Sequence, residues 1–498
     1  MFRKVLIANR GEIAVRIIRT LREMNIASVA VYSDADRKSL HVRMADEAAH
    51  IGPSPSTESY LRIDRILDAA RAHGAEAIHP GYGFLSERAV FAAACEGAGI
   101  TFIGPSAAAI LAMGSKTEAR RIAVAAGVPV VPGTASGSKN LEDVRSFTAK
   151  HGYPVILKAV AGGGGKGMRR VESERDLEAA FRDASSEAER AFGDGDVYVE
   201  RYIVEPRHIE IQIFGDSQGN YVHLGERECS LQRRHQKILE ECPSPLAEFH
   251  PELRERMGAA AISAARAAGY VNAGTVEFLA DSAGEFYFLE MNTRLQVEHP
   301  VTELVTGLDL VRLQIEIAAG RKLPFCQEDV TWRGAAIECR IYAEDPDNHF
   351  FPSPGKIEAF EAPAGPGVRL DSGVYTGWTV PIEYDPLLAK LTVWAGCREA
   401  AIARMRRALD ECIISGIKVN TAFFKVLLQD SRVLSGALHT GLVDEMLKIP
   451  KDSPPAENVT VAALAAAVDS LVRKDSAAKA PPACATQWRD QGRGGLLR

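Results

Sequence analysis

The sequence predicts an α/β fold at the N-terminus, followed by α+β structure that is mainly antiparallel at the C-terminus. Three observations predict this arrangement. Short apolar runs alternate with helical stretches over residues 1–115. Strands with alternating polar and apolar residues recur between residues 197 and 292, and further strand-like runs follow residue 335. Alternating strands and helices are typical of an open, mostly parallel sheet, whereas successive strands favour antiparallel pairing.

Length and composition limit the classes of protein to consider. A chain of 498 residues is too long for one compact core and predicts about three domains. Its 46% hydrophobic and 25% charged residues are ordinary for a globular protein. A net charge of −6 gives no reason to expect nucleic-acid binding, no apolar run is long enough to span a membrane, and the N-terminus lacks the features of a secretory signal. We therefore expect a cytoplasmic protein whose eight cysteines, with no C-x-x-C pair, are reduced thiols.

The first elements build the predicted parallel sheet. Lys4–Ala8 has the apolar run of a buried strand, and Glu12–Glu23 places aliphatic residues on one helical face. The turn between them lacks the G-x-G-x-x-G pattern, so a nicotinamide or flavin cofactor is not supported. Pro80-Gly81-Tyr82-Gly83 lies where the ligand crevices of such sheets open, and it fits a ligand site and a plain turn equally well. Further strands are expected at Ser28–Tyr32, Ala77–His79 and Thr101–Ile103.

A glycine-rich segment indicates phosphate binding. The strand Tyr153–Val160 carries Lys158, and the glycine-rich residues 162–167 join it to Met168–Val171. Consecutive glycines let backbone N–H groups approach a phosphate closely, which fits a flexible lid over a nucleotide better than a surface hairpin. Lys116 is a second candidate for a phosphate contact, although a solvated lysine is also consistent there.

The next strands carry both polar and apolar side chains. Val197–Ile203 is the first of them, and Arg207–Phe214 alternates polar residues with isoleucines, as expected of a half-buried strand. The basic run Arg227–Lys237 is consistent with a solvated loop, but we favour an anion site. A helix that begins with proline is expected over Pro251–Ala268.

A predicted β-hairpin gives the strongest indication of chemistry. If Ala283-Gly284 is a two-residue turn, the ladder places Glu277 directly opposite Glu290. Like charges that face each other are destabilising, so a cation is expected between them. Asn292 shares their face, and such oxygen ligands suit Mg²⁺ or Mn²⁺ together with nucleotide phosphates. A solvated strand face is the alternative.

Three residues beyond the hairpin extend the same pattern. Arg294, Gln296 and Glu298 continue the period of two, which would place them on the face that carries Asn292. They would add an anion clamp, an amide and a candidate base to the metal ligands.

The last third of the chain is expected to be antiparallel sheet with a covering helix. Ala335–Ala343 has the pattern of a strand that carries Glu338 and Arg340 on one face. Residues 450–498 are rich in proline and alanine and are expected to form a linker-like tail. The other predicted elements are strands at Ile357–Phe360, Val368–Leu370 and Leu391–Val393 and a helix over Arg398–Ala408.

Five motifs occur in a specific order: Ile7–Ala14 (IANRGEIA), His79–Glu87 (HPGYGFLSE), 162–168 (GGGGKGM), Gln232–Lys237 (QRRHQK) and Glu290–His299 (EMNTRLQVEH). Together they resemble the biotin carboxylases, which are ATP-grasp enzymes, over about residues 1–447. The resemblance implies an ATP-grasp fold with an N-terminal α/β domain at 1–115, an ATP-grasp domain at 116–320 whose lid spans about 131–203, a mainly antiparallel C-terminal domain at 330–447 and the tail at 450–498.

The resemblance also implies roles for individual residues. Metal ions, two Mg²⁺ or Mn²⁺, would be held by Glu277, Glu290 and Asn292. Bicarbonate would be held by Lys237, Arg294, Gln296 and Val297, with Glu298 as general base. The biotin ring would lie at Tyr82 and Arg340, and Arg340 would stabilise its developing charge. ATP would contact Lys116, Lys158, Gly164, Gly165, Glu200, Arg201, Ile203, His208, His235, Glu277 and Glu290.

By the same resemblance, the reaction carboxylates biotin with ATP and bicarbonate by way of carboxyphosphate. The sequence has no Met-Lys-Met motif, and 498 residues leave no room for a carboxyltransferase, so the biotin carrier and the carboxyltransferase are expected on other chains. A homodimer is the family expectation. The expected complex is acetyl-CoA carboxylase, with a propionyl-CoA, other acyl-CoA or pyruvate carboxylase as the alternative because of the segment Tyr384–Lys390.

Two further interpretations compete with this one. The first is an ATP-grasp ligase with another acceptor, and the HPGYGFLSE and RRHQK stretches argue against it. The second is a non-catalytic nucleotide-binding module, which would be expected to have lost at least one of the acidic and basic residues that are all present here.

Overall fold

The computed structural model describes residues 1–134, 137–159, 168–192, 195–449, 460–461, 463–468 and 470–471. The predicted glycine-rich loop at 162–167 lies outside these residues, as does most of the 450–498 tail. The chain divides into a large unit, Met1–Val443, and a small unit, Asp444–Arg498. No helix in the described ranges is long and apolar enough to cross a membrane. The account below concerns the large unit, together with α16 (Leu442–Lys448), which spans the division between the two units.

The N-terminal part is built on a five-stranded parallel sheet, as predicted, with the strand order β3-β2-β1-β4-β5. Val5 and Ile7 of β1 pack toward α1, whereas Leu6 packs toward α3 and α4 on the other face. Both faces are therefore buried, which explains the continuous apolar run. The elements are β1 (Lys4–Ile7), α1 (Gly11–Glu23), β2 (Ala27–Ser33), α2 (Leu40–Met44), β3 (Glu47–Gly52), α3 (Ile63–Ala72), β4 (Ala77–His79), α4 (Ala89–Gly97), β5 (Thr101–Phe102) and α5 (Ala107–Gly114).

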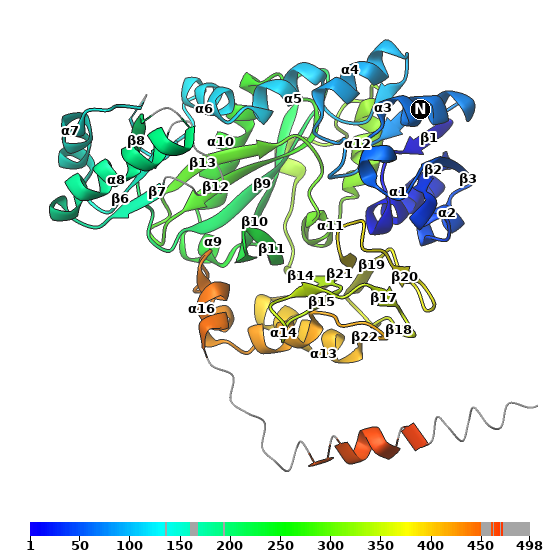
Figure 1. Ribbon diagram of the computed structural model, residues 1–498. Helices are drawn as coiled ribbons and strands as arrows, with labels where there is room; N and C mark the ends of the chain where they lie inside the picture. Colours follow the sequence, from blue (N-terminus) through cyan, green and yellow to red (C-terminus); the bar gives the residue numbers. More distant parts are fainter. Residues whose placement is uncertain are drawn as a thin grey trace, which may run out of the picture. The chain divides into compact units, whose positions relative to one another are not determined.

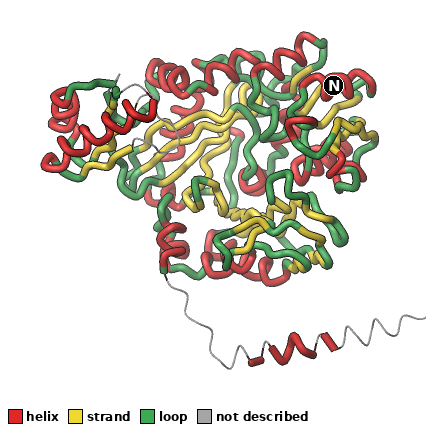
Figure 2. Tube along the Cα trace, viewed as in Figure 1, coloured by secondary structure: helices red, strands yellow, loops and turns green. Residues whose placement is uncertain are grey.

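An eight-stranded antiparallel sheet forms the rest of the framework, in the order β13-β12-β9-β10-β11-β14-β21-β19. The sheet is continuous across the expected domain limits at residues 320 and 330, because β14 pairs directly with β11. Figures 1 and 2 show its strands in the middle of the large unit with helices around them. The strands are β9 (Arg207–Gly215), β10 (Tyr221–Arg233), β11 (Gln236–Cys242), β12 (Asn272–Ala280), β13 (Phe286–Asn292), β14 (Ala335–Tyr342), β19 (Val368–Ser372) and β21 (Leu387–Ala395).

Helices and short strands complete the central and C-terminal parts. The helices are α6 (Lys116–Ala125), α9 (Pro245–Phe249), α10 (Leu253–Ala267), α11 (His299–Thr306), α12 (Leu310–Ala318), α13 (Arg398–Glu411), α14 (Thr421–Leu427), α15 (Ser431–Ser435) and α16 (Leu442–Lys448). The short strands are β15 (Glu344–Asp345), β16 (Phe351–Pro352), β17 (Gly355–Lys356), β18 (Ala359–Glu361), β20 (Thr379–Val380) and β22 (Ile413–Ser415). The helix expected from Pro251 thus begins two residues later, at Leu253.

One prediction about the central strands is wrong. All nine residues of β9 are buried, so this strand has no solvated face. The basic run Arg227–Lys237 is not a solvated loop, because most of it continues β10 and its last residues open β11. The favoured anion site in this run stays a prediction. Charged side chains in these strands are buried because residues on neighbouring strands pair with them, as Glu210 does with Arg227 at 2.5 Å.

A smaller antiparallel sheet, β7-β6-β8, has its own hydrophobic core and occupies the region of the predicted lid. Val144 of α7, Leu157 of β6 and Leu177 of α8 are among its buried residues. Figure 1 shows this sheet at one side of the central sheet. Its elements are α7 (Leu141–His151), β6 (Val155–Ala159), β7 (Met168–Val171), α8 (Glu174–Phe192) and β8 (Val197–Arg201).

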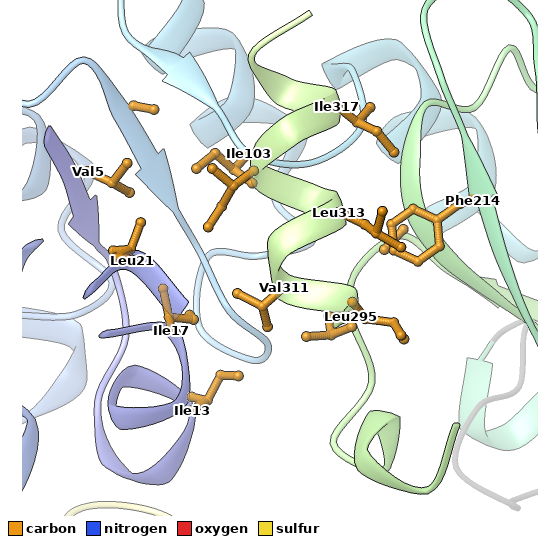
Figure 3. Packing of buried hydrophobic residues seen from close by; sticks show 14 of the residues in the cluster. Val5, Ile13, Ile17, Leu21, Ile103, Phe214, Leu295, Val311, Leu313 and Ile317 are labelled. Carbon is orange, nitrogen blue, oxygen red and sulfur yellow. The ribbon is translucent and has the colours of Figure 1, made fainter. Parts of the chain in front are cut away.

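The N-terminal and central parts share one hydrophobic core. Figure 3 shows Val311 of α12 between Ile17 of α1 and Leu295, while Leu313 lies beside Phe214 of β9. Each fully buried aliphatic side chain contributes about 1.5–3 kcal/mol relative to exposure. This shared core therefore fixes α1 and the segment around Leu295 relative to each other, and the polar residues described next adjoin both segments.

Candidate active site

A row of three carboxylates crosses neighbouring strands of the central sheet. Glu277 of β12 faces Glu290 of β13 on one side and Glu210 of β9 on the other. Arg227 of β10 continues the row beside Glu210. Neighbouring strands lie about 4.8 Å apart, so adjacent carboxylates repel unless cations compensate their charge. The predicted pairing of Glu277 with Glu290 is confirmed.

The hairpin turn differs from the predicted one, although the pairing does not. The turn contains the three residues 282–284, because the Asp281 N–H donates to the Glu285 carbonyl oxygen at 2.9 Å. Phe278 pairs with Phe288, so Leu289 is an additional residue in β13, a β-bulge. The longer turn and the bulge each shift the register by one residue, in opposite directions, and the two shifts cancel.

Lys237 is the principal compensating cation. Its Nζ lies 2.5 Å from Glu210 Oε2, 2.8 Å from Glu277 Oε1 and 2.8 Å from Glu298 Oε1. Burial lowers the pKa of this ammonium group, but the three carboxylates outweigh burial and hold its pKa well above the usual value. Burial raises the pKa of Glu277, yet Lys237 and His208 hold that pKa below its usual value. Lys237 and Glu277 are therefore both charged at neutral pH.

A strained turn between β10 and β11 positions Lys237. Arg234 and His235 have φ values of 50° and 64°. Two-residue hairpin turns usually use Asn-Gly at such positions, and each other residue costs roughly 1–2 kcal/mol. The strain indicates a turn that is kept for its side chains. His235, a predicted ATP contact, is exposed in this turn.

Glu298 is held between two cations. Lys237 contacts its Oε1, and Arg340 Nη2 lies 3.0 Å from its Oε2. Burial raises the pKa of Glu298, yet Lys237, Arg340 and Arg227 together hold it well below the usual value, so this buried side chain is ionised. A second acid, Glu240, accepts a hydrogen bond from Arg340 Nε at 2.5 Å, but burial raises its pKa to about 7.

The residues after β13 form a clamp, although not by extending the strand. β13 ends at Asn292, so the expected strand alternation through Glu298 is wrong. Arg294 instead donates to Asn292 Oδ1 at 3.1 Å and to Gln296 Oε1 at 3.0 Å. Glu87 accepts a hydrogen bond from Arg294 Nε at 2.8 Å. The predicted residues thus lie together because the chain after β13 forms a loop whose side chains are hydrogen-bonded to one another.

The residues predicted to contact ATP fall into two groups. Beside the carboxylate row, His208 Nε2 lies 2.9 Å from Glu277 Oε2 and the exposed Lys116 Nζ lies 4.0 Å from Glu290 Oε2. The second group belongs to the β7-β6-β8 sheet or follows it, and includes the Lys158–Glu200 ion pair at 2.5 Å, Arg201, which donates to Tyr287 Oη at 3.1 Å, and the buried Ile203. Gly164 and Gly165 lie outside the described residues.

A cavity of about 480 Å³ opens beside Arg294 and Arg340, and its lining includes Tyr82, Val297, Glu12 and Tyr384. N-terminal, central and C-terminal segments all contribute to it. The Asn9 side-chain amide donates to the carbonyl oxygens of Pro80 at 2.8 Å and Tyr82 at 2.7 Å. These two bonds hold the Pro80–Gly83 segment as a cavity wall rather than as a plain surface turn.

Several residues of this cluster were not singled out from the sequence. Glu87 fell within the HPGYGFLSE motif without a role, and Glu210 was expected on a solvated face. Glu240 follows Leu239 in a segment that carried no expectation, and Arg227 was part of the basic run. A charged residue inside an otherwise apolar strand was the available signal, because such a residue is buried only with partners.

Three family models match the chain. Residues 1–110 match "Biotin carboxylase, N-terminal domain", residues 115–326 match "Carbamoyl-phosphate synthase L chain, ATP binding domain", and residues 338–445 match "Biotin carboxylase C-terminal domain". These matches account for most of the large unit.

Known proteins of this kind are similar along most of their length. A pyruvate carboxylase subunit of Methanothermobacter thermautotrophicus is 54% identical over 445 residues, 89% of this chain and 90% of that protein. Biotin carboxylase 1 of Bacillus subtilis is 52% identical over 445 residues, 89% of this chain and 98% of that protein. The biotin carboxylase domain dimer of Hydrogenobacter thermophilus 2-oxoglutarate carboxylase, solved with MgADP, ADP and bicarbonate, has 47% identity and a TM-score of 0.79 over 91% of this chain and all of that one. The chain therefore belongs to the biotin carboxylases, ATP-grasp ligases that carry out carboxylation.

Proposed function

We propose that this chain carboxylates biotin on a separate carrier protein, using ATP and bicarbonate. The observation that carries the proposal is the convergence of Lys237, Glu298 and Arg340 between the carboxylate row and the cavity. The carboxylate row supplies oxygen ligands for a metal–nucleotide complex, and the cavity supplies a second compartment that Arg340 lines. One cluster can therefore activate bicarbonate beside the carboxylate row and bind the biotin ring in the cavity.

The carboxylate row fits Mg²⁺ or Mn²⁺ by its chemistry. Glu277 and Glu290 face each other, and the Asn292 side chain lies against Glu277 at 2.8 Å. Hard oxygen donors are the ligands that these ions prefer. Burial and the neighbouring Glu277 raise the pKa of Glu290, so positive charge placed between the two would be favourable. We assign the two metal ions to these three residues, where such ions would neutralise charge during phosphoryl transfer.

Different residues of the chain carry out proton removal, charge stabilisation and bicarbonate binding. Glu298, ionised and fixed by two cations, removes the proton of bicarbonate as general base. The resulting anion attacks the γ-phosphate of ATP, ADP leaves, and carboxyphosphate forms. Carboxyphosphate decomposes to CO₂ and phosphate, the phosphate can take the proton of the ureido nitrogen of biotin, and that nitrogen bonds to CO₂. Arg340 then stabilises negative charge on the ureido oxygen of biotin, beside Tyr82. The bicarbonate ion is held by Lys237, Arg294, Gln296 and Val297.

The nucleotide assignments and domain limits are proposed on the same grounds. His208 and Lys116 adjoin the carboxylate row, which supports contacts with phosphates. The domains are proposed at 1–115, 116–320 with its lid at about 131–203, and 330–447, followed by a linker-like tail at 450–498. The remaining proposed ATP contacts are Lys158, Gly164, Gly165, Glu200, Arg201, Ile203, His235, Glu277 and Glu290.

For the complex, we propose acetyl-CoA carboxylase, with the biotin carrier and the carboxyltransferase on other chains. The names of the similar proteins include pyruvate, 2-oxoglutarate and methylcrotonoyl-CoA carboxylases, so a propionyl-CoA, other acyl-CoA or pyruvate carboxylase is the alternative. A homodimer is supported by the dimer of the Hydrogenobacter domain. A cytoplasmic location stays a prediction.

The deciding experiment is ATP hydrolysis by the purified chain with Mg²⁺ and bicarbonate, with and without free biotin. We expect hydrolysis that requires bicarbonate and rises with biotin. Hydrolysis that is indifferent to both would refute the biotin assignment. Adding the carrier, the carboxyltransferase and each acceptor in turn would then identify the complex.

A further inference from the structure

A cross-strand pair of cations holds Val297 and Glu298, two successive residues of the active-site loop, residues 293–298. Arg340 of β14 and Lys390 of β21 are direct partners in the sheet register. Arg340 contacts the Glu298 side chain at 3.0 Å, while Lys390 Nζ donates to the Val297 carbonyl oxygen at 2.8 Å. The loop is thus fixed through a side chain at one residue and through its backbone at the preceding one.

Lys390 also reaches the N-terminal part of the chain. Its Nζ lies 3.3 Å from Glu12 Oε2 at the start of α1 and 5.7 Å from the centre of the Tyr82 ring. The Lys390 side chain is fully buried, and the Glu12 side chain is 3% exposed. Gly373 packs so closely on α1 that a Cβ at this position would lie 2.7 Å from the Glu12 nitrogen. Lys390 therefore connects α1, a cavity wall and the active-site loop.

Stability is a poor explanation for this arrangement. Apart from the Lys390 contact at 3.3 Å from Oε2, the buried carboxylate of Glu12 has no hydrogen-bond partner among the described residues, and Glu12 lines the cavity. A buried ion pair with unsatisfied oxygens recovers little of its desolvation cost, and well-packed apolar residues would often serve stability better. Lys390 instead provides a buried hydrogen-bond donor for the Val297 carbonyl oxygen.

We propose that Lys390 is a positioning residue for the reaction: it fixes the Val297 carbonyl group and thereby the loop that carries Glu298, while Glu12 balances its charge. This inference rests on the proposed function, because bicarbonate and the general base are assigned to that loop. Lys390 itself acts through the loop and reaches no substrate.

The test uses the full chain with Lys390→Met, Glu12→Gln and the double variant. A misplacement of about 1 Å can reduce turnover roughly a hundredfold, so we expect Lys390→Met to lower bicarbonate-dependent turnover by about ten- to a hundredfold with KM for ATP unchanged. The double variant leaves no unpaired buried charge, so it should recover the thermal stability that Lys390→Met loses, but not the turnover. If Lys390→Met does not fold, the double variant alone carries the test.

Hydrogen exchange of the peptide spanning residues 293–299 supplies a readout that is independent of activity. We expect faster exchange in Lys390→Met and in the double variant. The matched control is Arg398→Met, because Arg398 likewise joins a buried carboxylate, Glu241, to the carbonyl oxygens of Val433 and Leu434 but contacts none of the loop. This control should lose stability and keep its turnover and its exchange in 293–299.

Two results would overturn the positioning role: wild-type turnover in the double variant, or unchanged exchange in 293–299. Failure of the proposed function is distinguishable, because the wild-type chain would then lack bicarbonate-dependent hydrolysis while the exchange of 293–299 still responded to Lys390→Met.

Discussion

Glu277 and Glu290 face each other across the β12–β13 ladder but stand in different surroundings. Glu277 is buried against Lys237 and His208, whereas the Glu290 side chain is 40% exposed and lies 4.0 Å from the exposed Lys116 Nζ. The positive charge of the cluster is therefore concentrated on one member of the pair. Glu290 is the member that gains most from an added metal ion.

Glu290→Gln should change activity and stability in opposite directions. Removing one of two facing carboxylates relieves repulsion, so the melting temperature should stay the same or rise. Loss of a metal ligand should raise the Mg²⁺ concentration needed for half-maximal ATP hydrolysis by roughly tenfold or more. A Mg²⁺ titration and a thermal melt measure both effects. Glu285→Gln, in the same hairpin but exposed, is the control, and an unchanged Mg²⁺ requirement in Glu290→Gln would exclude Glu290 as a ligand.

Glu298→Gln should abolish turnover while ATP still binds. The substitution keeps the volume of a fully buried side chain but removes the group assigned as general base, a role worth roughly 10²–10⁴ in rate. Nucleotide affinity should change little, because the assigned ATP contacts lie on other elements. Bicarbonate-dependent hydrolysis and nucleotide titration measure the two effects. Turnover near the wild-type level would remove Glu298 from the mechanism.

Glu87→Gln should weaken bicarbonate use without affecting the nucleotide. Glu87 fixes Arg294 Nε at 2.8 Å and accepts from the Thr293 N–H at 3.1 Å. Glutamine can keep the second bond but loses the charge that orients the guanidinium, and hydrogen bonds to charged groups contribute about 1.5–3 kcal/mol. We expect KM for bicarbonate to rise roughly tenfold, with KM for ATP constant. Glu76→Gln, which breaks an exposed ion pair with Arg3, should leave both constants unchanged.

Glu12→Gln should alter the pH dependence of stability. Burial raises the pKa of Glu12 from 4.5 to about 7, although Lys390 opposes this rise, and Asp371 and Arg369 are the other charged groups that act on it. The native state then binds this proton more tightly than the unfolded state, so the stabilisation present below pH 4.5 is lost as pH rises toward 7. The free energy of unfolding of the variant minus that of the wild type should therefore increase by about 3 kcal/mol from pH 4.5 to pH 7. Melting temperatures over this range test it, and a constant difference would contradict the shifted pKa.

The parallel sheet could be predicted from local patterns, whereas the roles of Lys237, Arg340 and Tyr82 were implied only by the family resemblance. Apolar runs that are buried on both faces and motifs with fixed spacing depend on neighbouring residues in the chain. The Glu277–Glu290 register was also predicted, but only because the unpredicted bulge at Leu289 compensated for the unpredicted third turn residue. An apolar residue such as Leu289 fits a regular strand equally well, so nothing in the sequence marks the bulge.

The buried charges could not be predicted, because their partners are distant in the chain. Arg227 fitted a loop, but Glu210 on the neighbouring strand β9 and Thr275 on β12, the next strand beyond it, accept hydrogen bonds from its guanidinium group. In the same way, Arg233 is buried in β10 with Glu344, which lies 111 residues away. A charged residue in the sequence predicts an exposed side chain, and it is buried only when a residue distant in the sequence pairs with it.

The continuous sheet has a consequence for how the chain can be divided. A fragment that ends before β14 would leave the N–H and C=O groups of β11 unpaired along Leu239–Cys242. An open strand edge of this kind is a template for pairing with other chains, so such a fragment would tend to self-associate. The same cut would leave Glu240 and Glu298 without Arg340. The ATP-binding part and the C-terminal part are thus joined by the β11–β14 strand pair. The C-terminal strands cover the edge of β11 that would otherwise be open.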